Sequence, residues 1–249
     1  MLNVQKNTIE NKTVLYSGKN VLDVMSEAKN YNYFLFGILE TILKNNTIHK
    51  ILDFGAGQGC FAKLLRQHYN KTDINCVEID DEYYLKLKED GFETYYDIND
   101  INYNTKYDLV YSFNVLEHIE DDFKTLVKIK NKLSENGNLI LYVPAFQFLY
   151  SNFDKKISHK RRYSKKDLIA KIQKAGFEIN KMEYVDSLGF LCAIIYKMFV
   201  NKDKLNKNTL KIYDRFLFPI SRFLDKIGFK YILGKNLLLI AKIKEVKEV

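Results

Sequence analysis

The stretch that most constrains the fold is ILDFGAGQGC, residues 51–60. An apolar run that contains Asp53 leads into Gly55, Gly57 and Gly59, three of the chain's 11 glycines. Glycine adopts positive φ readily and lets a ligand approach the backbone, because it has no Cβ. Residues 60–69 then show helical spacing. A loop between a strand and a helix lies at the edge where open α/β sheets bind ligands, so the sequence predicts a ligand-binding turn here.

Apolar strands and amphipathic helices alternate along the first 145 residues. Several of these strands are apolar on both faces, which is typical of a parallel sheet covered by helices on both sides. A basic segment follows the fifth strand, and mostly helical sequence extends from 188 to about 233. The spacing predicts helices over 21–44, 60–69, 81–91, 121–137 and 164–175, and strands over 49–54, 74–80, 92–97, 107–114, 138–145, 177–186 and 236–244.

The glycine spacing discriminates between nucleotide cofactors. Nicotinamide-binding loops read G-x-G-x-x-G, and the third glycine of that pattern would fall on Cys60. Here the third glycine is Gly59 instead, and no lysine occupies the position that a phosphate-binding P-loop requires. The loop therefore excludes a P-loop and disfavours an oxidoreductase.

Five segments together resemble the class I S-adenosylmethionine (SAM)-dependent methyltransferases, over roughly residues 48–145: ILDFGAGQG, CVEIDDEYY, YYDINDI, YDLVYSFNVLEHI and GNLILYVPAF. The segment HKRRYS (159–164) is similar to those of the bacterial type 11/12-like group that acts on small molecules and sugars. The resemblance implies an α/β, Rossmann-like, doubly wound sheet of seven strands. Six strands are parallel and the last is antiparallel, with SAM lying across the strand ends.

The same resemblance suggests which residues hold SAM. Asp53 could accept a hydrogen bond from the methionine ammonium, and Glu78 lies 23 residues after Gly55, near the offset expected of a ribose-binding acid. Asp97 could accept from the adenine amino group, although DIND could also be a turn. Without the glycine loop, Asp53 and Glu78 would be interpreted as solvated acids at strand ends. The alternative for Tyr31 is a core residue rather than part of a lid. The expected cofactor-binding residues are Tyr31, Asp53, Gly55, Ala56, Gly57, Glu78, Ile79, Asp97, Ile98, Asn114 and Leu116; Glu117 would wall the same site near the sulfonium.

The segment after the fifth strand points to the acceptor. Residues 155–166 contain seven Lys or Arg and no acid. Arg161 and Arg162 could clamp a phosphate or carboxylate, and His159 could act as a base. The alternative is a solvated basic loop that precedes helix 164–175, with Ser164 as its N-cap. The expected substrate-binding residues are His159, Arg161, Arg162 and Tyr163, and the expected catalytic residues are His118 and His159; His118 could instead orient its loop.

The residues after the fourth predicted strand bear on the atom that is methylated. Methylases of adenine or glutamine amides carry Asn/Asp-Pro-Pro-Tyr/Phe there, whereas this chain reads NVLE, 114–117. We therefore expect O-methylation of a small polar or anionic metabolite that contains a phosphate, carboxylate or sugar. The resemblance makes surface polysaccharide biosynthesis a reasonable setting. The net charge of +8 keeps an RNA or protein methyltransferase open, and a non-catalytic SAM-fold binding protein is a third reading.

Four parts are expected: an N-terminal helical lid (1–44), a SAM-binding core (45–187) with a basic substrate loop (146–163), a helical insertion (188–236), and a closing strand and tail (237–249). The aromatic insertion could roof the acceptor pocket, form a dimer interface or rest on a membrane surface. The N-terminus lacks a secretory leader, and the longest apolar run, 188–196, is too short to span a bilayer. We expect a soluble, cytoplasmic monomer or homodimer that does not bind nucleic acid. The three scattered cysteines predict neither disulfides nor a metal site.

Overall fold

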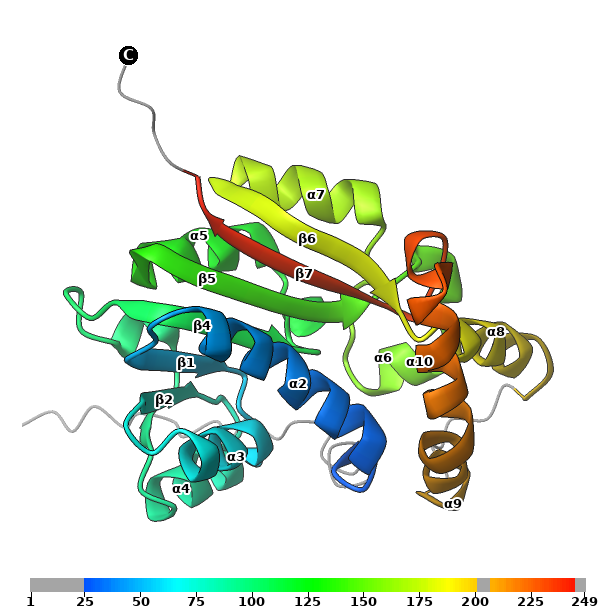
Figure 1. Ribbon diagram of the computed structural model, residues 1–249, viewed down its shortest axis with the longest axis horizontal. Helices are drawn as coiled ribbons and strands as arrows, with labels where there is room; N and C mark the ends of the chain where they lie inside the picture. The colour runs from blue at the N-terminus through cyan, green and yellow to red at the C-terminus, as the bar shows by residue number, and fades with distance from the viewer. Residues whose placement is uncertain (1–24, 201–206, 245–249) are drawn as a thin grey trace, which may run out of the picture.

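The computed structural model describes residues 25–200 and 207–244. Its centre is a seven-stranded sheet in the order β3-β2-β1-β4-β5-β7-β6 (Figure 1). β7 pairs antiparallel with both β5 and β6, whereas β1 to β5 are mutually parallel. This confirms the predicted Rossmann-like sheet with an antiparallel last strand. The strands are β1 (Lys50–Phe54), β2 (Asp73–Val77), β3 (Glu93–Tyr95), β4 (Tyr107–Phe113), β5 (Leu133–Pro144), β6 (Phe177–Val185) and β7 (Asn236–Ile243).

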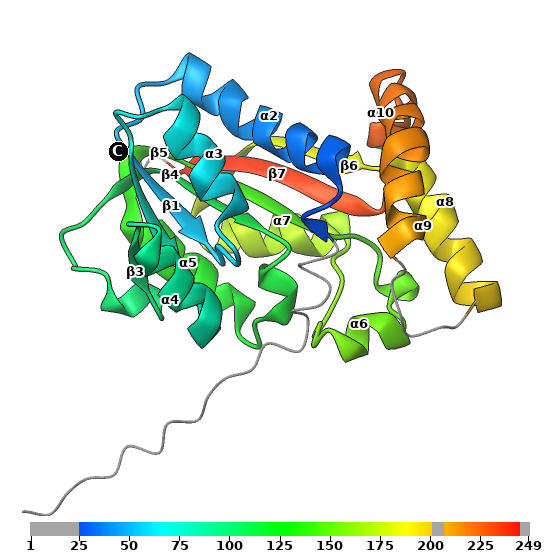
Figure 2. The ribbon, with the colours of Figure 1, turned by 90° about the horizontal axis from the view of Figure 1, so that it is seen from below.

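Helices cover both faces of the sheet (Figure 2). Alternate strand residues point to opposite faces, and the two hydrophobic cores follow this alternation: Ile51 belongs to one core and Leu52 to the other. The first core packs under α2 (Lys29–Asn45), α3 (Cys60–His68) and α4 (Asp81–Glu89). The second packs under α5 (Asp122–Lys132) and α7 (Lys165–Lys174). The burial of β1 and β4 on both sides explains their nearly continuous apolar sequences.

Several predicted boundaries are wrong: the helix predicted over 21–44 begins at Lys29, the strand predicted over 74–80 ends at Val77, and the helix after β4 ends early. Helical spacing predicted a helix as far as residue 137, but α5 ends at Lys132 and β5 begins at Leu133. Leu133 pairs with Tyr107 of β4, and the register shifts between Tyr107 and Leu109. Gly137 lies in this irregular stretch, where a Cβ would come within 2.9 Å of the Tyr107 carbonyl oxygen. Pairing with β4 therefore overrides the local helical preference of residues 133–137.

The segment between β6 and β7 is helical, as predicted, over its described residues. It forms α8 (Ser187–Ile195), π-helical η4 (Tyr196–Val200), α9 (Lys207–Ile212), π-helical η5 (Tyr213–Leu217), α10 (Phe218–Lys226) and η6 (Phe229–Tyr231) at one end of the sheet (Figures 1 and 2). The buried Asp225 carboxylate of α10 accepts hydrogen bonds from the main-chain N–H groups of Asp186 (2.9 Å) and Ser187 (3.1 Å). This contact fixes the insertion to the end of β6.

The expected lid is described only in part, because residues 1–24 lie outside the described residues. Its described portion, α2, begins beside the insertion, where Asp214 of η5 accepts hydrogen bonds from the N–H groups of Asn30 (3.0 Å) and Tyr31 (2.9 Å). In the described part of the chain, no helix combines the length and apolar character needed to cross a bilayer.

Candidate cofactor and acceptor site

A cavity of about 540 Å³ opens at the carboxyl ends of β1, β2 and β4. The glycine loop after β1, the end of β2, the loop after β4, the segment 153–162 and the first turn of α2 all contribute to its lining. Residues of the insertion, among them Tyr213, Asp214 and Phe218, line it as well. This is the edge at which open α/β sheets bind ligands.

The glycine loop follows β1 in a conformation that glycine suits. Gly55, Gly57 and Gly59 have φ values of 85°, 53° and 73°, in the left-handed region that is costly for residues with a Cβ. A Cβ on Gly55 would also lie 2.3 Å from Cγ2 of Val115. The N–H groups of Gly55 and Ala56 donate to the Val77 carbonyl oxygen at 2.9 and 3.1 Å. The loop is thereby held against the end of β2.

Glu78 lies directly after β2 and fixes the same loop. Its buried carboxylate accepts hydrogen bonds from the N–H groups of Gly57 (2.6 Å) and Asp80 (2.9 Å), one on each oxygen. Burial raises the pKa of Glu78, and these two hydrogen bonds oppose that rise. A carboxylate has about four acceptor positions, so each oxygen retains capacity for a ribose hydroxyl in the cavity that it lines.

Asp53 presents an unsatisfied acceptor to the cavity. Its side chain is buried, and its Oδ2 atom accepts no hydrogen bond from the described residues. Burial raises the pKa of Asp53 from 3.8 to about 7, and the charge of Glu78 raises it further, whereas the Tyr111 hydroxyl favours the ionised form. A buried acceptor without a partner is costly. The ammonium of SAM would satisfy it, so the residues present fit this cofactor.

Tyr31 and Asn114 contact each other in the cavity lining. Asn114, directly after β4, has a φ of 55°, and its Nδ2 atom donates to the Tyr31 hydroxyl at 3.2 Å. The Tyr31 ring contacts Tyr142 and Phe218 edge to face, with centroids 5.9 and 5.6 Å apart. Burial raises the pKa of Tyr31 well above its usual value, so the phenol stays neutral. Both side chains line the cavity, as expected of cofactor-binding residues, and their contact with SAM remains a prediction.

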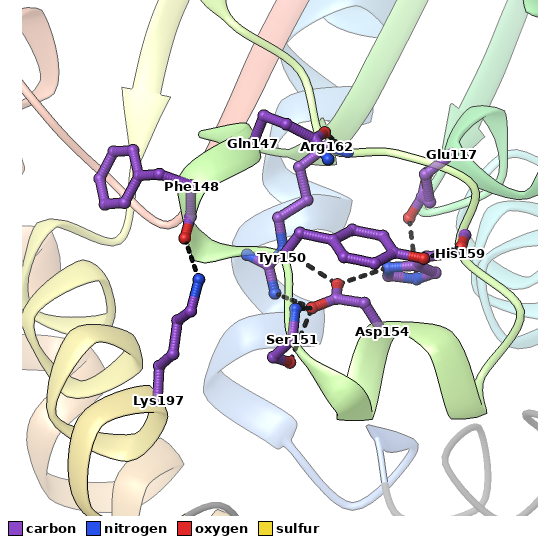
Figure 3. Close-up of polar contacts among 9 residues, drawn as sticks. All are labelled: Glu117, Gln147, Phe148, Tyr150, Ser151, Asp154, His159, Arg162 and Lys197. Carbon is purple, nitrogen blue, oxygen red and sulfur yellow. Dashed lines mark hydrogen bonds and ion pairs between the residues drawn. The ribbon is translucent and has the colours of Figure 1, made fainter.

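A carboxyl group and two imidazoles lie together in the cavity lining. The Glu117 side chain has no exposed surface, and neither of its oxygens accepts a hydrogen bond from any residue in the described ranges. His159 Nε2 lies 3.7 Å from Glu117 Oε1, and the rings of His118 and His159 have centroids 4.6 Å apart (Figure 3 shows Glu117 and His159). Burial raises the pKa of Glu117 to about 8 and lowers that of His118 to about 4, and the charge of His159 lowers the latter further.

Asp154, in the short helix α6 (Asn152–Lys156), holds His159 and Arg162 in place (Figure 3). Its Oδ1 atom lies 2.8 Å from His159 Nδ1 and 2.9 Å from Arg162 Nε, and its Oδ2 atom accepts from Arg162 Nη2 at 3.0 Å. Burial alone would raise the pKa of Asp154, but the contacts with His159 and Arg162 hold it well below its usual range. The carboxylate is therefore ionised, and it fixes which His159 nitrogen faces Glu117.

The structure brings most of the expected residues to the cavity. It is lined by Tyr31, Asp53, Gly55, Ala56, Gly57, Glu78, Ile79, Asn114, His118, His159 and Arg162. Asp97, Ile98 and Leu116 lie outside its lining. Asp97 caps a 3₁₀ turn by accepting from the Asn99 N–H at 2.7 Å, while Ile98 and Leu116 are buried in the core beneath.

The expected anion clamp finds no support in the contacts of its members. Arg161 and Tyr163 lie outside the cavity lining, where the Asp122 carboxylate contacts Arg161 Nη1 (3.1 Å) and accepts from the Tyr163 hydroxyl (2.8 Å). Arg162 does line the cavity, but Asp154 binds its guanidinium. Asp122, which is distant in the sequence, and Asp154, which lies just before the basic run, neutralise these cations. The run of basic residues alone could not reveal these partners.

Sequence reasoning did not select Asp154 or the individual residues of the insertion that line the cavity. One signal was present for Asp154: Ser151-x-x-Asp154 is a capping-box spacing, and Ser151 N donates to Asp154 Oδ2 at 2.9 Å. This spacing would have predicted a short helix that begins at Ser151, with the Asp154 side chain bonded to the main chain rather than to solvent. For Asp186, Tyr213, Asp214 and Phe218 there was no comparable signal, because only tertiary folding brings the insertion to the cavity.

Comparisons with known proteins identify the family of the chain. A model of a family described as a methyltransferase domain matches residues 28–181, more than half of the chain. No match was found among the curated proteins.

The solved structures that match share the fold at low identity. A SAM-dependent methyltransferase from Archaeoglobus fulgidus is 17% identical, with a TM-score of 0.56 over 88% of this chain and 93% of that one. A sarcosine dimethylglycine methyltransferase from Galdieria sulphuraria is 16% identical, with a TM-score of 0.55 over 89% and 85%. A Haemonchus contortus phosphoethanolamine N-methyltransferase bound to SAM is 17% identical, with a TM-score of 0.54 over 83% of this chain and 52% of that one. With the family match and the cavity beside the glycine loop, the chain belongs to the methyltransferase domain family and is a SAM-dependent methyltransferase.

Proposed function

We propose that this enzyme methylates a hydroxyl oxygen of a small polar acceptor. The observation that supports this most is a group of three side chains in the cavity lining. A buried carboxyl group and two imidazoles, those of Glu117, His118 and His159, meet there. A hydroxyl acceptor must lose its proton as it is methylated, and groups of this kind assist such a transfer.

Two groups of residues in the cavity lining would have different roles. Asp53 and Glu78 would hold the amino-acid and ribose parts of SAM, and Glu117, His118 and His159 would face the acceptor. When bound, SAM supplies a methyl group on a sulfonium, and its transfer to an acceptor oxygen breaks the S–C bond and leaves a neutral thioether. The chain's own contribution is to hold the acceptor oxygen in line with that bond, because positioning accounts for much of the rate of such a displacement.

The size of the cavity favours a small acceptor, which we expect to be anionic or sugar-like. Ligand pockets for drug-sized molecules measure about 300–1,000 Å³, so 540 Å³ leaves limited room beside SAM. Three cationic side chains belong to the lining: Lys160, Arg162 and Lys235. Asp154 binds Arg162, and Lys160 Nζ lies 3.3 Å from Glu120 Oε2. Lys235 is therefore the cation of the three that we expect to attract a phosphate or carboxylate. A role in surface polysaccharide biosynthesis is supported only by the resemblance of residues 159–164.

The proposal is tested by measuring S-adenosylhomocysteine release with matched acceptors. The panel pairs sugars and sugar phosphates with amines of similar size. We expect turnover with a hydroxyl acceptor, and Glu117→Gln should lower kcat by roughly 10²–10⁴ while leaving the affinity for S-adenosylhomocysteine unchanged. The matched control is Glu120→Gln, since Glu120 is an exposed acid on the same loop. Turnover with amines alone, or an unaltered kcat in Glu117→Gln, would refute it.

The insertion bears on partners. Its described residues include many exposed apolar side chains, among them Met198, Phe216, Phe223 and Ile232. The insertion also lines the cavity through Tyr213 and Phe218, which supports the roof that we ranked first among its roles. A homodimer interface, contact with a membrane surface and a cytoplasmic location remain predictions from the sequence.

A further inference from the structure

Three potential metal ligands converge in the cavity lining. Glu117, His118 and His159 each offer a ligand atom within 4.8 Å of the other two, and Glu117 Oε1 lies 3.7 Å from His159 Nε2. Zinc–nitrogen and zinc–oxygen bonds measure about 2.0–2.2 Å, so two ligands of one ion lie at most about 4.4 Å apart. Small side-chain rotations would close these three atoms around one ion.

The surroundings of His159 are those of a metal-bound imidazole. Ligating histidines almost always donate their second ring N–H to a carboxylate or carbonyl, which fixes the ring and its tautomer. His159 does this through Nδ1, which lies 2.8 Å from the ionised Asp154, and Nε2 then faces Glu117 (Figure 3). Arg162 holds the Asp154 carboxylate from its other side through Nε and Nη2. His159 is thus oriented by two successive buried contacts.

Glu117 provides an independent second observation. Its side chain is completely buried and lines the cavity, yet neither carboxylate oxygen accepts a hydrogen bond within the described residues. An unpaired buried carboxyl group is costly unless a cation or donor satisfies it. Arg162 does not fill this role, because the hydrogen bonds of its guanidinium go to Asp154.

We propose that Glu117, His118 and His159 bind one divalent ion of the first transition series and leave coordination positions open toward the cavity. Two imidazoles and one carboxylate suit zinc, manganese, iron or cobalt, whereas magnesium and calcium prefer ligand sets made of oxygen alone. Three protein ligands with an open position are typical of catalytic rather than structural zinc. The sequence analysis predicted no metal site; the three members of this set come from two loops far apart in the sequence.

The role of such an ion rests on the proposed function. An acceptor hydroxyl oxygen could occupy an open position, where the ion lowers its pKa and fixes its direction. The proton would then pass to solvent, and Glu117 and His159 would act through the ion rather than as bases. Metal binding itself needs no acceptor, so the site can be tested without turnover.

The test is calorimetric titration of the full-length chain, stripped with EDTA, with Zn²⁺ and with Co²⁺, whose visible absorption reports its ligands. We expect one equivalent of each to bind, with Mg²⁺ at least 100-fold weaker. Glu117→Gln and His159→Asn should each lower the affinity at least 100-fold, and Asp154→Asn by 10- to 100-fold, the range for outer-shell partners. S-adenosylhomocysteine binding by each variant serves as the check of folding.

The control removes the chain's other two histidines and leaves the site intact. The double variant His49→Asn/His68→Asn, both exposed positions, should keep full affinity and the same cobalt spectrum. Loss of binding in this variant, or equal affinity in Glu117→Gln, would overturn the proposal. Hydroxyl methylation that proceeds in a chain with no bound metal would also overturn it and leave the proposed function standing. A bound metal without turnover on any hydroxyl acceptor would refute the proposed function and leave the site standing.

Discussion

At the scale of single residues, Asp53 links cofactor binding to pH. Its folded-state pKa of about 7 lies above the usual 3.8 because the carboxylate is buried. The folded protein therefore holds a proton that the unfolded chain has lost, and this group makes the unliganded protein less stable as pH rises from about 4 to 7. An ammonium ligand has the opposite preference, because it pairs with the ionised carboxylate.

We therefore predict that the affinity for S-adenosylhomocysteine rises about tenfold between pH 6 and 8 and that binding releases a proton. Titration calorimetry in buffers of different ionisation enthalpy measures both. In Asp53→Asn the affinity should be lower and nearly constant over this range. If the affinity of Asp53→Asn still depends on pH, another titratable group is responsible and the prediction is wrong. The titratable groups near Asp53 are Cys60, Cys76, Glu78 and Tyr111.

Gly55 is the residue at which the loop tolerates least change. Alanine there would combine a φ of 85° with a Cβ 2.3 Å from Val115, and the backbone strain alone costs about 1–2 kcal/mol. Gly55→Ala should lower the Tm by roughly 2–8 °C and abolish S-adenosylhomocysteine binding. Adding Val115→Ala should restore part of the Tm, because it removes the clash but not the strain.

Gly37 is the matched control for that substitution. It lies in α2, and nothing lies within 4 Å of the position that a Cβ would take. Gly37→Ala should raise stability by about 0.5–1 kcal/mol. An equal Tm for both alanine variants would contradict the account of the loop.

At the scale of elements, the insertion supports the start of α2. Ala28, the N-cap residue of α2, makes no capping hydrogen bond with its side chain, and the Asp214 carboxylate of η5 accepts instead from Asn30 and Tyr31. A carboxylate at a helix N-terminus satisfies free N–H groups and interacts favourably with the helix dipole. This contact positions Tyr31 against Asn114 and Phe218.

Asp214→Ala should therefore lower stability by about 1–3 kcal/mol, speed amide exchange in the first turn of α2 and weaken S-adenosylhomocysteine binding. Asp121→Ala is the control, because Asp121 caps α5 with a hydrogen bond to Lys124 N and does not line the cavity. It should lower stability without altering the affinity. If both variants bind S-adenosylhomocysteine as tightly as the unsubstituted chain, α2 does not contribute to the cofactor site.

The segment 150–163 depends on one buried acid. Removing the charge of Asp154 leaves Arg162 largely unpaired in a buried position, which typically costs about 3–5 kcal/mol. Asp154→Asn should lower the Tm accordingly, while Lys155→Gln, at the exposed neighbouring position, should leave it unchanged. Thermal unfolding measures both, and equal Tm values would contradict the importance of the Asp154 contacts.

At the scale of the whole molecule, local patterns predicted the order of the elements and the glycine loop. The strands were predictable because parallel strands buried on both faces have continuous apolar sequences. The loop was predictable because Gly55 adopts a positive φ that few other residues adopt. The end of α5 was missed because pairing with β4 overrides local spacing. The carboxylate partners of Arg161 and Arg162, which are Asp122 and Asp154, could not be predicted from the run of charges, and the anion clamp stays a prediction. Residues such as Asp214 could not be predicted, since their role exists only once the insertion has folded onto the sheet.

The central claim is that the loop at Gly55, with Asp53 and Glu78, holds SAM. Titration calorimetry with S-adenosylhomocysteine tests it most directly, with NAD as the competing nucleotide and Asp73→Ala as a control at an exposed acid on β2. We expect the unsubstituted chain and Asp73→Ala each to bind one equivalent of S-adenosylhomocysteine. Asp53→Ala should bind none, and NAD should not bind. Equal binding of NAD, or unchanged affinity for S-adenosylhomocysteine in Asp53→Ala, would contradict it.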